Sequence, residues 1–144
     1  MKEEKINEKK ANEEKTNQKK ELICIVCPIG CHIEAELDPE GNILSLSGNS
    51  CGRGAVYAKA ELTNPVRVLT STVKITDGLY RRLPVITSQA IPKDRIFDVM
   101  KEINKVQVCA PVKINDIVIG DVCGLGVDII SSRSMESVRY KEQG

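Results

Sequence analysis

Tryptophan is absent from the sequence, and aromatic side chains amount to only 3% of its 144 residues. Such a small supply of flat rings is poorly suited to stacking nucleic-acid bases or to lining a pocket for a planar ligand. The formal net charge is only +1, so the composition gives no electrostatic reason to expect nucleic acid or an anionic membrane as a partner. The single histidine argues against a metallohydrolase site built from several histidines.

Long apolar runs are missing as well, which argues against a transmembrane helix. The chain does not open with a basic segment followed by an apolar run and a small-residue cleavage site, so we expect no secretion and a cytoplasmic location. In a reducing cytoplasm, closely spaced cysteines bind metal or carry out redox chemistry more often than they form structural disulfides.

The common catalytic motifs are not found either. The sequence has no G-x-S-x-G nucleophile turn, no G-x-x-x-x-G-K phosphate loop and no dinucleotide-binding fingerprint. We therefore expect no enzymatic activity of the chain's own, and the cysteines become the place to look for function.

Six cysteines are present, and four of them fall between residues 24 and 51. Their spacing is Cys24-x2-Cys27-x3-Cys31-x19-Cys51. Thiolate sulfur is a soft, anionic ligand that suits zinc or the iron of iron–sulfur clusters, whereas magnesium and calcium prefer oxygen. The four cysteines are therefore the candidate ligands of a metal site.

The grouping of these cysteines favours a 4Fe–4S cluster over a single zinc ion. Structural zinc sites with four cysteines usually take two pairs, each from its own short loop. Here three cysteines share one loop and the fourth arrives alone, a pattern typical of 4Fe–4S clusters. Zinc remains the alternative, and it would make the chain a structural module for protein–protein interaction.

The residues around these cysteines fit a negatively charged cluster. Gly30 allows a tight turn before the third cysteine. Cys51 stands at the start of an expected helix, where the amides of Gly52, Arg53 and Gly54 are free to donate hydrogen bonds. Such donors, together with the Arg53 side chain, would stabilise the cluster and raise its reduction potential.

Other thiols and the histidine have plainer interpretations. A dithiol of Cys24 and Cys27 would need a helix opening at Cys24, which the following Pro28 disfavours. Cys109 and Cys123 lie in apolar stretches, so we expect both to pack in the core, with a second redox site as the alternative. His32 follows a full set of four thiols, and we expect it to be exposed or to make an outer hydrogen bond.

Apolar periodicity and turn residues predict an α+β fold, in which a cysteine-rich hairpin and helix module packs on a mixed, strand-rich domain. The expected elements are strands over 22–26, 33–37 and 43–46, a helix over 52–63, a hairpin over 66–76 and 79–87, an amphipathic helix after Pro92, and short strands over 106–114, 117–122 and 126–130. Pro84 lacks an amide hydrogen, so we expect its strand at a sheet edge or a bulge.

The length suits one ordinary domain rather than two. The expected parts are a disordered charged tail (1–21), the cysteine module (22–65), the α+β remainder of the same domain (66–131) and a polar C-terminal tail (132–144). The first tail consists mostly of Lys and Glu and has too little apolar surface to offset the entropy of ordering it.

Residues 24–54, with the later stretch Asn64-Pro65-Val66-Arg67-Val68-Leu69, resemble the N-terminal iron–sulfur module of molybdopterin oxidoreductases. In those enzymes x-Lys-Gly or a similar sequence follows the fourth cysteine, whereas this chain has Gly52-Arg53-Gly54, and the preceding loop is shorter here. The chain also lacks the downstream parts that bind the pterin. The resemblance therefore implies a cluster site and not molybdenum catalysis.

Residues 22–133, nearly the whole chain, resemble a family of small uncharacterised proteins of anaerobic bacteria and archaea that share four cysteines and are described as potential metal-binding proteins. The phrases that carry the resemblance are Cys27-Pro28-x-Gly30-Cys31, Cys51-x-Arg53-Gly54, Asn64-Pro65-x-Arg67, Ile91-Pro92-Lys93 and the stretch from Ala110-Pro111-Val112 to Gly126-Val127-Asp128. Members look like neighbours of flavin-dependent oxidoreductases of the glycerol-3-phosphate dehydrogenase type. This association implies an accessory role in electron transfer. A subunit that only stabilises its partner, without transferring electrons, remains a further possibility.

Overall fold

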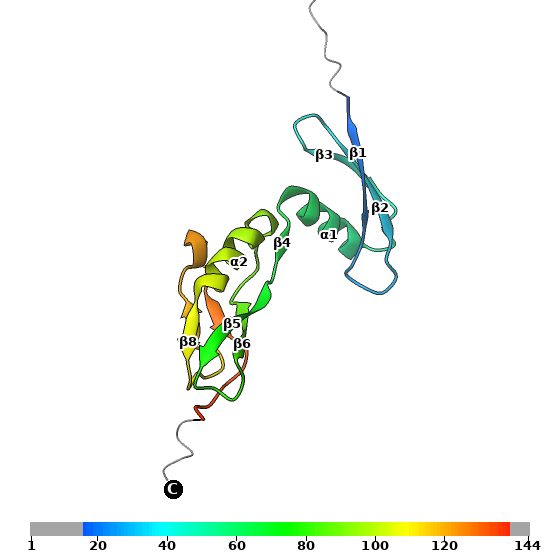
Figure 1. The fold of residues 1–144 in the computed structure, drawn as a ribbon. Coiled ribbons are helices and arrows are strands. Elements are labelled where there is room, and N and C mark those ends of the chain that lie inside the picture. Colours follow the sequence, from blue (N-terminus) through cyan, green and yellow to red (C-terminus); the bar gives the residue numbers. More distant parts are fainter. Residues whose placement is uncertain (1–15, 139–144) are drawn as a thin grey trace, which may run out of the picture. The chain divides into compact units, whose positions relative to one another are not determined.

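The computed structural model describes residues 16–138 and divides into two compact units, with the boundary between Thr63 and Asn64 (Figure 1). Both helices and sheets are present, so the expected α+β class is confirmed. The sequence led us to expect a single domain. The structure instead has two units, each with its own cluster of buried apolar side chains.

The first unit contains an antiparallel three-stranded sheet of β1 (Gln18–Ile23), β2 (His32–Leu37) and β3 (Ile43–Ser47), in that order. Every second residue of β2 is buried, as the alternation of Ile33, Ala35 and Leu37 predicts. β1 begins at Gln18 and takes in four residues that the sequence assigned to the charged tail. These residues pair with β2 along their whole length. Residues 1–15 of that expected tail lie outside the described part.

The turn and helix that follow lie where the sequence predicts them. Asp38 accepts hydrogen bonds from the amide (2.7 Å) and the side chain (2.7 Å) of Asn42, which closes the turn between β2 and β3. These bonds, led by the one from the Asn42 side chain, lower the pKa of the Asp38 carboxyl. Helix α1 (Gly52–Thr63) has the predicted bounds and ends just before Asn64-Pro65.

The second unit is built around a mixed five-stranded sheet in the order β8-β5-β6-β10-β9. The β5–β8 pair is parallel, and the other pairs are antiparallel. The strands of this sheet are β5 (Thr70–Thr76), β6 (Arg82–Thr87), β8 (Gln107–Cys109), β9 (Ile117–Ile119) and β10 (Ile129–Ser131). A separate two-stranded ladder joins β4 (Val66–Arg67) to β7 (Ile91–Pro92).

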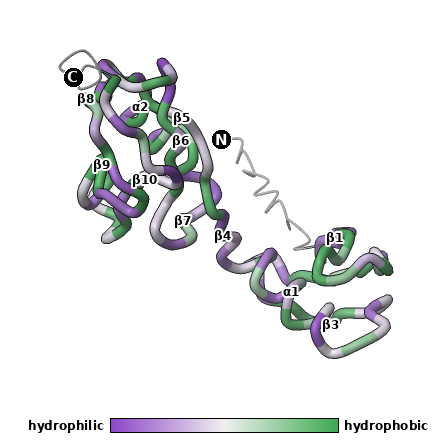
Figure 2. The backbone as a smooth tube through the Cα atoms, turned by 90° about the horizontal axis from the view of Figure 1, so that it is seen from below, coloured by the Kyte–Doolittle hydropathy of each residue, from purple (hydrophilic) through white to green (hydrophobic). Residues whose placement is uncertain are grey.

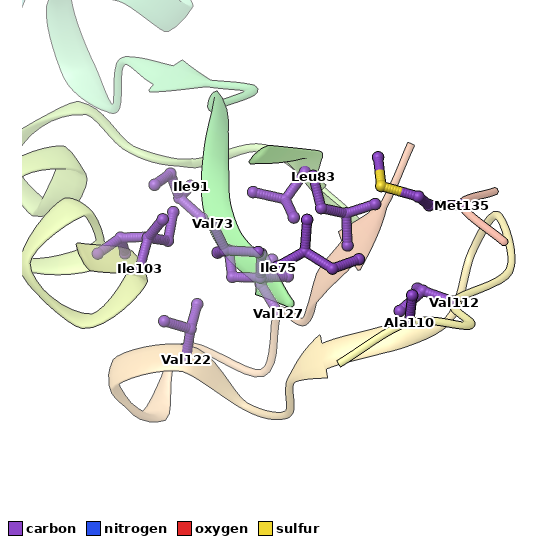
Figure 3. Close-up of a cluster of buried hydrophobic side chains, with 13 residues drawn as sticks. Val73, Ile75, Leu83, Ile91, Ile103, Ala110, Val112, Val122, Val127 and Met135 are labelled. Atoms are coloured by element: carbon purple, nitrogen blue, oxygen red, sulfur yellow. The ribbon is translucent and has the colours of Figure 1, made fainter. Parts of the chain in front are cut away.

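The core of the second unit lies between α2 (Ile96–Lys105) and one face of this sheet. Hydrophobic and hydrophilic residues alternate along α2 (Figure 2), and its buried side chains are Val99 and Ile103. Figure 3 shows Ile103 beside Val73 and Ile75 of β5. A short 3-10 turn (Lys93–Arg95) precedes α2, so the amphipathic helix expected after Pro92 is confirmed. In residues 16–138, no helix combines the length and the apolar character needed to cross a membrane.

The expectation that Pro84 marks an edge strand is wrong. Its strand, β6, is central in the sheet and pairs with both β5 and β10. The carbonyl of Pro84 accepts a hydrogen bond from the Ser132 amide (3.1 Å), just beyond the end of β10 at Ser131. The nitrogen of Pro84 faces the same neighbouring strand as its carbonyl, which is β10. Because the regular pairing of β6 with β10 ends at Val85 and Ser131, the missing N–H removes no regular ladder bond.

Residues 132–138, which the sequence assigned to a polar tail, belong to the folded second unit. Met135 exchanges two backbone hydrogen bonds with Val112 (2.7 and 2.9 Å), and its side chain is buried in the second core (Figure 3). The Val138 amide donates to the carbonyl of Asp77 (2.8 Å). Met135 thus completes part of the core, backbone hydrogen bonds hold the segment as far as Val138, and residues 139–144 lie outside the described part.

Two cations face each other on the outer side of the sheet. Lys74 of β5 is directly opposite Arg82 of β6, and both side chains are exposed. Like charges at directly opposed positions destabilise a strand pair. We therefore expect this pair to destabilise the sheet locally.

We expect Lys74→Thr to stabilise the second unit by about 0.2–1 kcal/mol at low salt, because it removes this repulsion. Urea unfolding, followed at amide resonances of β5 and β6, measures the effect. The gain should shrink at high salt and be smaller in an Arg82→Thr background, where the repulsion is already absent. An equal gain in both backgrounds would show that strand propensity, not charge, is responsible.

Candidate metal centre

The register of β1 and β2 fixes the two ends of the cysteine loop. Ile23 pairs with His32, and the next residue, Cys24, donates its amide hydrogen to the carbonyl of Cys31 (2.9 Å). Cys24 and Cys31 therefore sit across from each other where the loop leaves the sheet. Gly30 has a φ of +63°, the left-handed conformation that the sequence predicted for the tight turn before Cys31.

Ser50 connects this loop to the start of α1. The sulfur of Cys31 lies 3.2 Å from the hydroxyl oxygen of Ser50. As a thiol, Cys31 donates to that oxygen; as a thiolate, it accepts from the same hydroxyl, which is free to rotate. The hydroxyl of Ser50 and then its backbone lower the pKa of Cys31, while its partial desolvation and, to a smaller extent, Cys51 act in the opposite direction. Ser50 directly precedes Cys51, so it links the cysteine loop to the start of α1.

Cys51 precedes the first residue of α1 and is exposed. Hydrogen bonds from the amide of Gly54, then from the amide and guanidinium of Arg53, lower the pKa of the Cys51 thiol. The side chain of Asn49 donates to the carbonyl of Cys51 (3.0 Å), which fixes the approach to the helix. Of the three helix-start donors that the sequence indicated, Arg53 and Gly54 thus act on Cys51, while the role of Gly52 stays a prediction.

Cys24 is the buried member of the four cysteines. It belongs to the core of the first unit with Ile33 and Ala58. Gly54 packs against the same place: a Cβ at residue 54 would lie 3.7 Å from the Cys24 sulfur, 3.4 Å from Ile33 Cδ1 and 3.1 Å from Asn49 Cβ. Gly54 thus lets the first turn of α1 approach Cys24 closely.

Gly48 allows the chain to leave β3 toward Ser50. Its φ is +89°, in the left-handed region. A Cβ at this position would overlap the carbonyl oxygen of His32, the residue that follows Cys31. Only glycine therefore fits between the end of β3 and the start of β2.

The backbone, rather than direct contacts of the sulfurs, links the four cysteines. Cys24 and Cys31 share a backbone hydrogen bond, the Cys31 sulfur lies beside the hydroxyl of Ser50, the residue before Cys51, and Cys27 lies half-buried in the loop. Within the described range, no three or more His, Cys, Asp or Glu side chains stand so that they could hold a metal ion. By the chemistry of its donors the site fits an iron–sulfur cluster: the thiols are free and soft, and hydroxyl and amide donors act on two of them.

The expectations for His32, Cys109 and Cys123 have different outcomes. His32 is exposed, which is one of the two expected outcomes. Cys123 packs partly against the second core, but Cys109 is exposed, so its predicted core position is wrong. The neighbour of Cys109 in β8, Val108, faces the core instead, and the Cys109 thiol donates to a carboxylate oxygen of Asp77 (3.3 Å). Sequence reasoning missed Ser50; a serine just before a helix indicates only an N-terminal cap.

A matched pair of glycine variants tests the packing at the helix start. Gly52 has no neighbour within 4 Å of its would-be Cβ, so Gly52→Ala should gain helix propensity, up to about 1 kcal/mol. Gly54→Ala should be less stable than Gly52→Ala by at least about 1 kcal/mol, because Asn49 and Ile33 must shift. Urea unfolding of the first unit measures both, and equal stabilities would contradict the packing.

The thiolate character of Cys51 has a measurable pH dependence. Because its pKa is lowered in the folded chain, Cys51 should react with iodoacetamide at lower pH when folded than when unfolded in urea. Stability linked to this group is present above the pKa of the unfolded thiol and is lost as the pH falls through the folded pKa. Arg53→Ala removes only the guanidinium, so it should move the alkylation profile part of the way toward that of the unfolded chain. Identical folded and unfolded profiles would contradict the role of the helix amides.

Comparison with known proteins gives one family. None of the curated proteins matches the chain. An NMR structure of a Clostridium perfringens protein is 22% identical and matches with a TM-score of 0.47 over 50% of this chain and 86% of that one. A family model described as "Protein of unknown function (DUF1667)" matches residues 52–133, more than half of the chain. This agrees with the resemblance to an uncharacterised family, while the likeness to the molybdopterin oxidoreductase module stays a prediction. The chain belongs to the DUF1667 family.

Proposed function

We propose that this protein binds a 4Fe–4S cluster through Cys24, Cys27, Cys31 and Cys51 and transfers single electrons as an accessory subunit or partner of a flavin-dependent oxidoreductase. The observation that carries the proposal is the convergence of hydrogen-bond donors on free thiols: Ser50 acts on Cys31, and the start of α1 acts on Cys51. Iron–sulfur clusters are held by thiolates, and hydrogen bonds to these sulfurs set their potentials.

The charges around the site support this use. A cluster with four thiolate ligands is negative, and α1 is a 12-residue helix whose positive end lies at Cys51. Arg53 adds a full positive charge at the same place, and the first turn of α1 contains no acidic residue. When bound, the cluster would supply one-electron redox chemistry; the chain's residues bind it, direct donors toward its ligands and bury Cys24 away from water.

The surface beside the cysteines suits transient docking. Ile25 and Ile29 of the cysteine loop are 70% and 72% exposed, and Val56 on α1 is 70% exposed. A shallow groove next to them is lined by Val26, Gly52, Arg53, Val56, Tyr57 and Ala60. Exposed apolar side chains around a redox site are what a partner would cover when it approaches within electron-transfer distance.

The flavin-dependent partner rests on the resemblance of the sequence and on redox chemistry. A flavin handles electrons singly or in pairs, so a one-electron carrier can exchange electrons with it. The exposed Cys51 would be the ligand nearest to such a partner, since Cys24 is buried in the first core. The chain needs no substrate pocket for this role.

Anaerobic reconstitution with iron and sulfide tests the proposal. We expect about four iron and four sulfide per chain, together with a broad visible absorbance. Cys51→Ser should lose most of both, while Cys109→Ser and Cys123→Ser serve as matched controls that retain them. Colourless protein that binds one zinc ion and no iron would favour the structural zinc module, and protein that takes up neither would overturn the metal site altogether.

A further inference from the structure

One face of the five-stranded sheet in the second unit is open. The inward side chains of β5 and β6, such as Val73, Ile75 and Leu83, pack against the core under α2. The alternating outward side chains remain exposed or half-buried. This open face carries two rows of different chemistry, which the strand register defines.

The first row is basic. Lys74 pairs in register with Arg82 of β6 on one side and with Gln107 of β8 on the other. Arg81 lies in the adjoining turn and lines the same shallow pocket as these three residues. Within residues 16–138, no ion pair satisfies Lys74, Arg81 or Arg82. Asp77 also lines the pocket, where it accepts a hydrogen bond from the Cys109 thiol, and its single negative charge is outnumbered by the three cations.

The second row is apolar. Ile86 of β6 pairs in register with Ile130 of β10, which pairs in turn with Ile117 of β9. Ile86 and Ile130 are half-buried, and Ile117 is 64% exposed. Ile86 lies four residues along β6 from Arg82, so the two rows are about 13 Å apart at the rise of a strand.

We propose that this open face binds an acidic segment of a partner protein, with an apolar side chain on the isoleucine row and carboxylates on the basic row. Unneutralised cations that face each other across two strands gain most from a ligand that brings negative charge to both. The spacing of the rows corresponds to about four residues of extended chain.

The shape of the face distinguishes this ligand from others. Small-molecule sites enclose most of their ligand, whereas this pocket is a shallow depression on a sheet. Single-stranded nucleic acid is bound largely through aromatic rings that stack on its bases, and among the described residues the ring that lines this pocket, Tyr80, already has the guanidinium of Arg133 over it, 5.0 Å from the ring centre. An apolar row beside a charged row is instead the arrangement of a protein interface, with an apolar centre and a polar rim. The proposal does not depend on the metal site.

The test uses the full chain and a six-residue peptide, Leu-Thr-Gly-Thr-Glu-Glu, blocked at both ends. Amide chemical shifts measure binding, and a matched peptide with two glutamines in place of the glutamates is the control. We expect saturable shifts at Lys74, Arg82, Gln107 and Ile130, and at least tenfold weaker binding of the glutamine peptide. High salt should weaken binding of the acidic peptide until its affinity approaches that of the glutamine peptide.

Charge reversal makes the test sharper. The double variant Lys74→Glu/Arg82→Glu keeps two like charges opposite each other, so its fold is matched in repulsion to the natural pair. It should bind the acidic peptide at least tenfold more weakly and bind the corresponding Leu-Thr-Gly-Thr-Lys-Lys peptide instead. Lys101→Glu on α2, away from the open face, should leave binding of the acidic peptide unchanged. Ile130→Ser should weaken binding of the acidic peptide to the otherwise natural chain. Added to the double variant, it should weaken binding of the Leu-Thr-Gly-Thr-Lys-Lys peptide.

Three results would overturn the proposal. The first is no saturable shift on the basic row at millimolar peptide, or equal affinity for the acidic and glutamine peptides. The second is tighter binding of a DNA oligonucleotide than of the acidic peptide at the same residues, which would assign the face to nucleic acid. The third is a change in the amide shifts of residues 16–63 caused by the double reversal alone, which would mean that the face is occupied by the chain's own first unit.

Discussion

The pairing of Ile23 with His32 is the constraint on which the cysteine site depends. Once these residues are opposite each other, Cys24 and Cys31 must lie at the two ends of one short loop, joined by a backbone hydrogen bond. A slip of one residue would turn Cys24 from the core to the other face of the sheet. Leu22, the residue of β1 that packs in the same core as Cys24, would turn away from the core with it, so the slip would expose apolar surface of β1.

Local sequence signals predicted the first unit well. The alternation of β2, the Asp38–Asn42 turn and the bounds of α1 depend on neighbouring residues, and all three are confirmed. The division into two units, the central position of Pro84 and the packing of Met135 depend instead on contacts between residues far apart in sequence. Propensities and turn motifs carry no information on such contacts, so the sequence could not give them.

The candidate site shows the same limit. Spacing predicts Cys24, Cys27, Cys31 and Cys51 as a candidate set, and the residues after the fourth cysteine include Arg53 and Gly54, which act on its thiol. It gives no hint that Ser50 reaches Cys31 across 19 residues of chain. Nor does it show which cysteine is buried, since that follows from how α1 lies on the sheet around Cys24 and Ala58.

Gly48 has a consequence for how variants of this protein should be interpreted. It contributes no atom to any candidate ligand, yet any side chain at this position collides with the backbone carbonyl of His32, the residue after Cys31. In a mutational scan that scores cofactor content, residue 48 would therefore be as intolerant as the cysteines themselves. A reader of such a scan who equated intolerance with ligation would count one ligand too many.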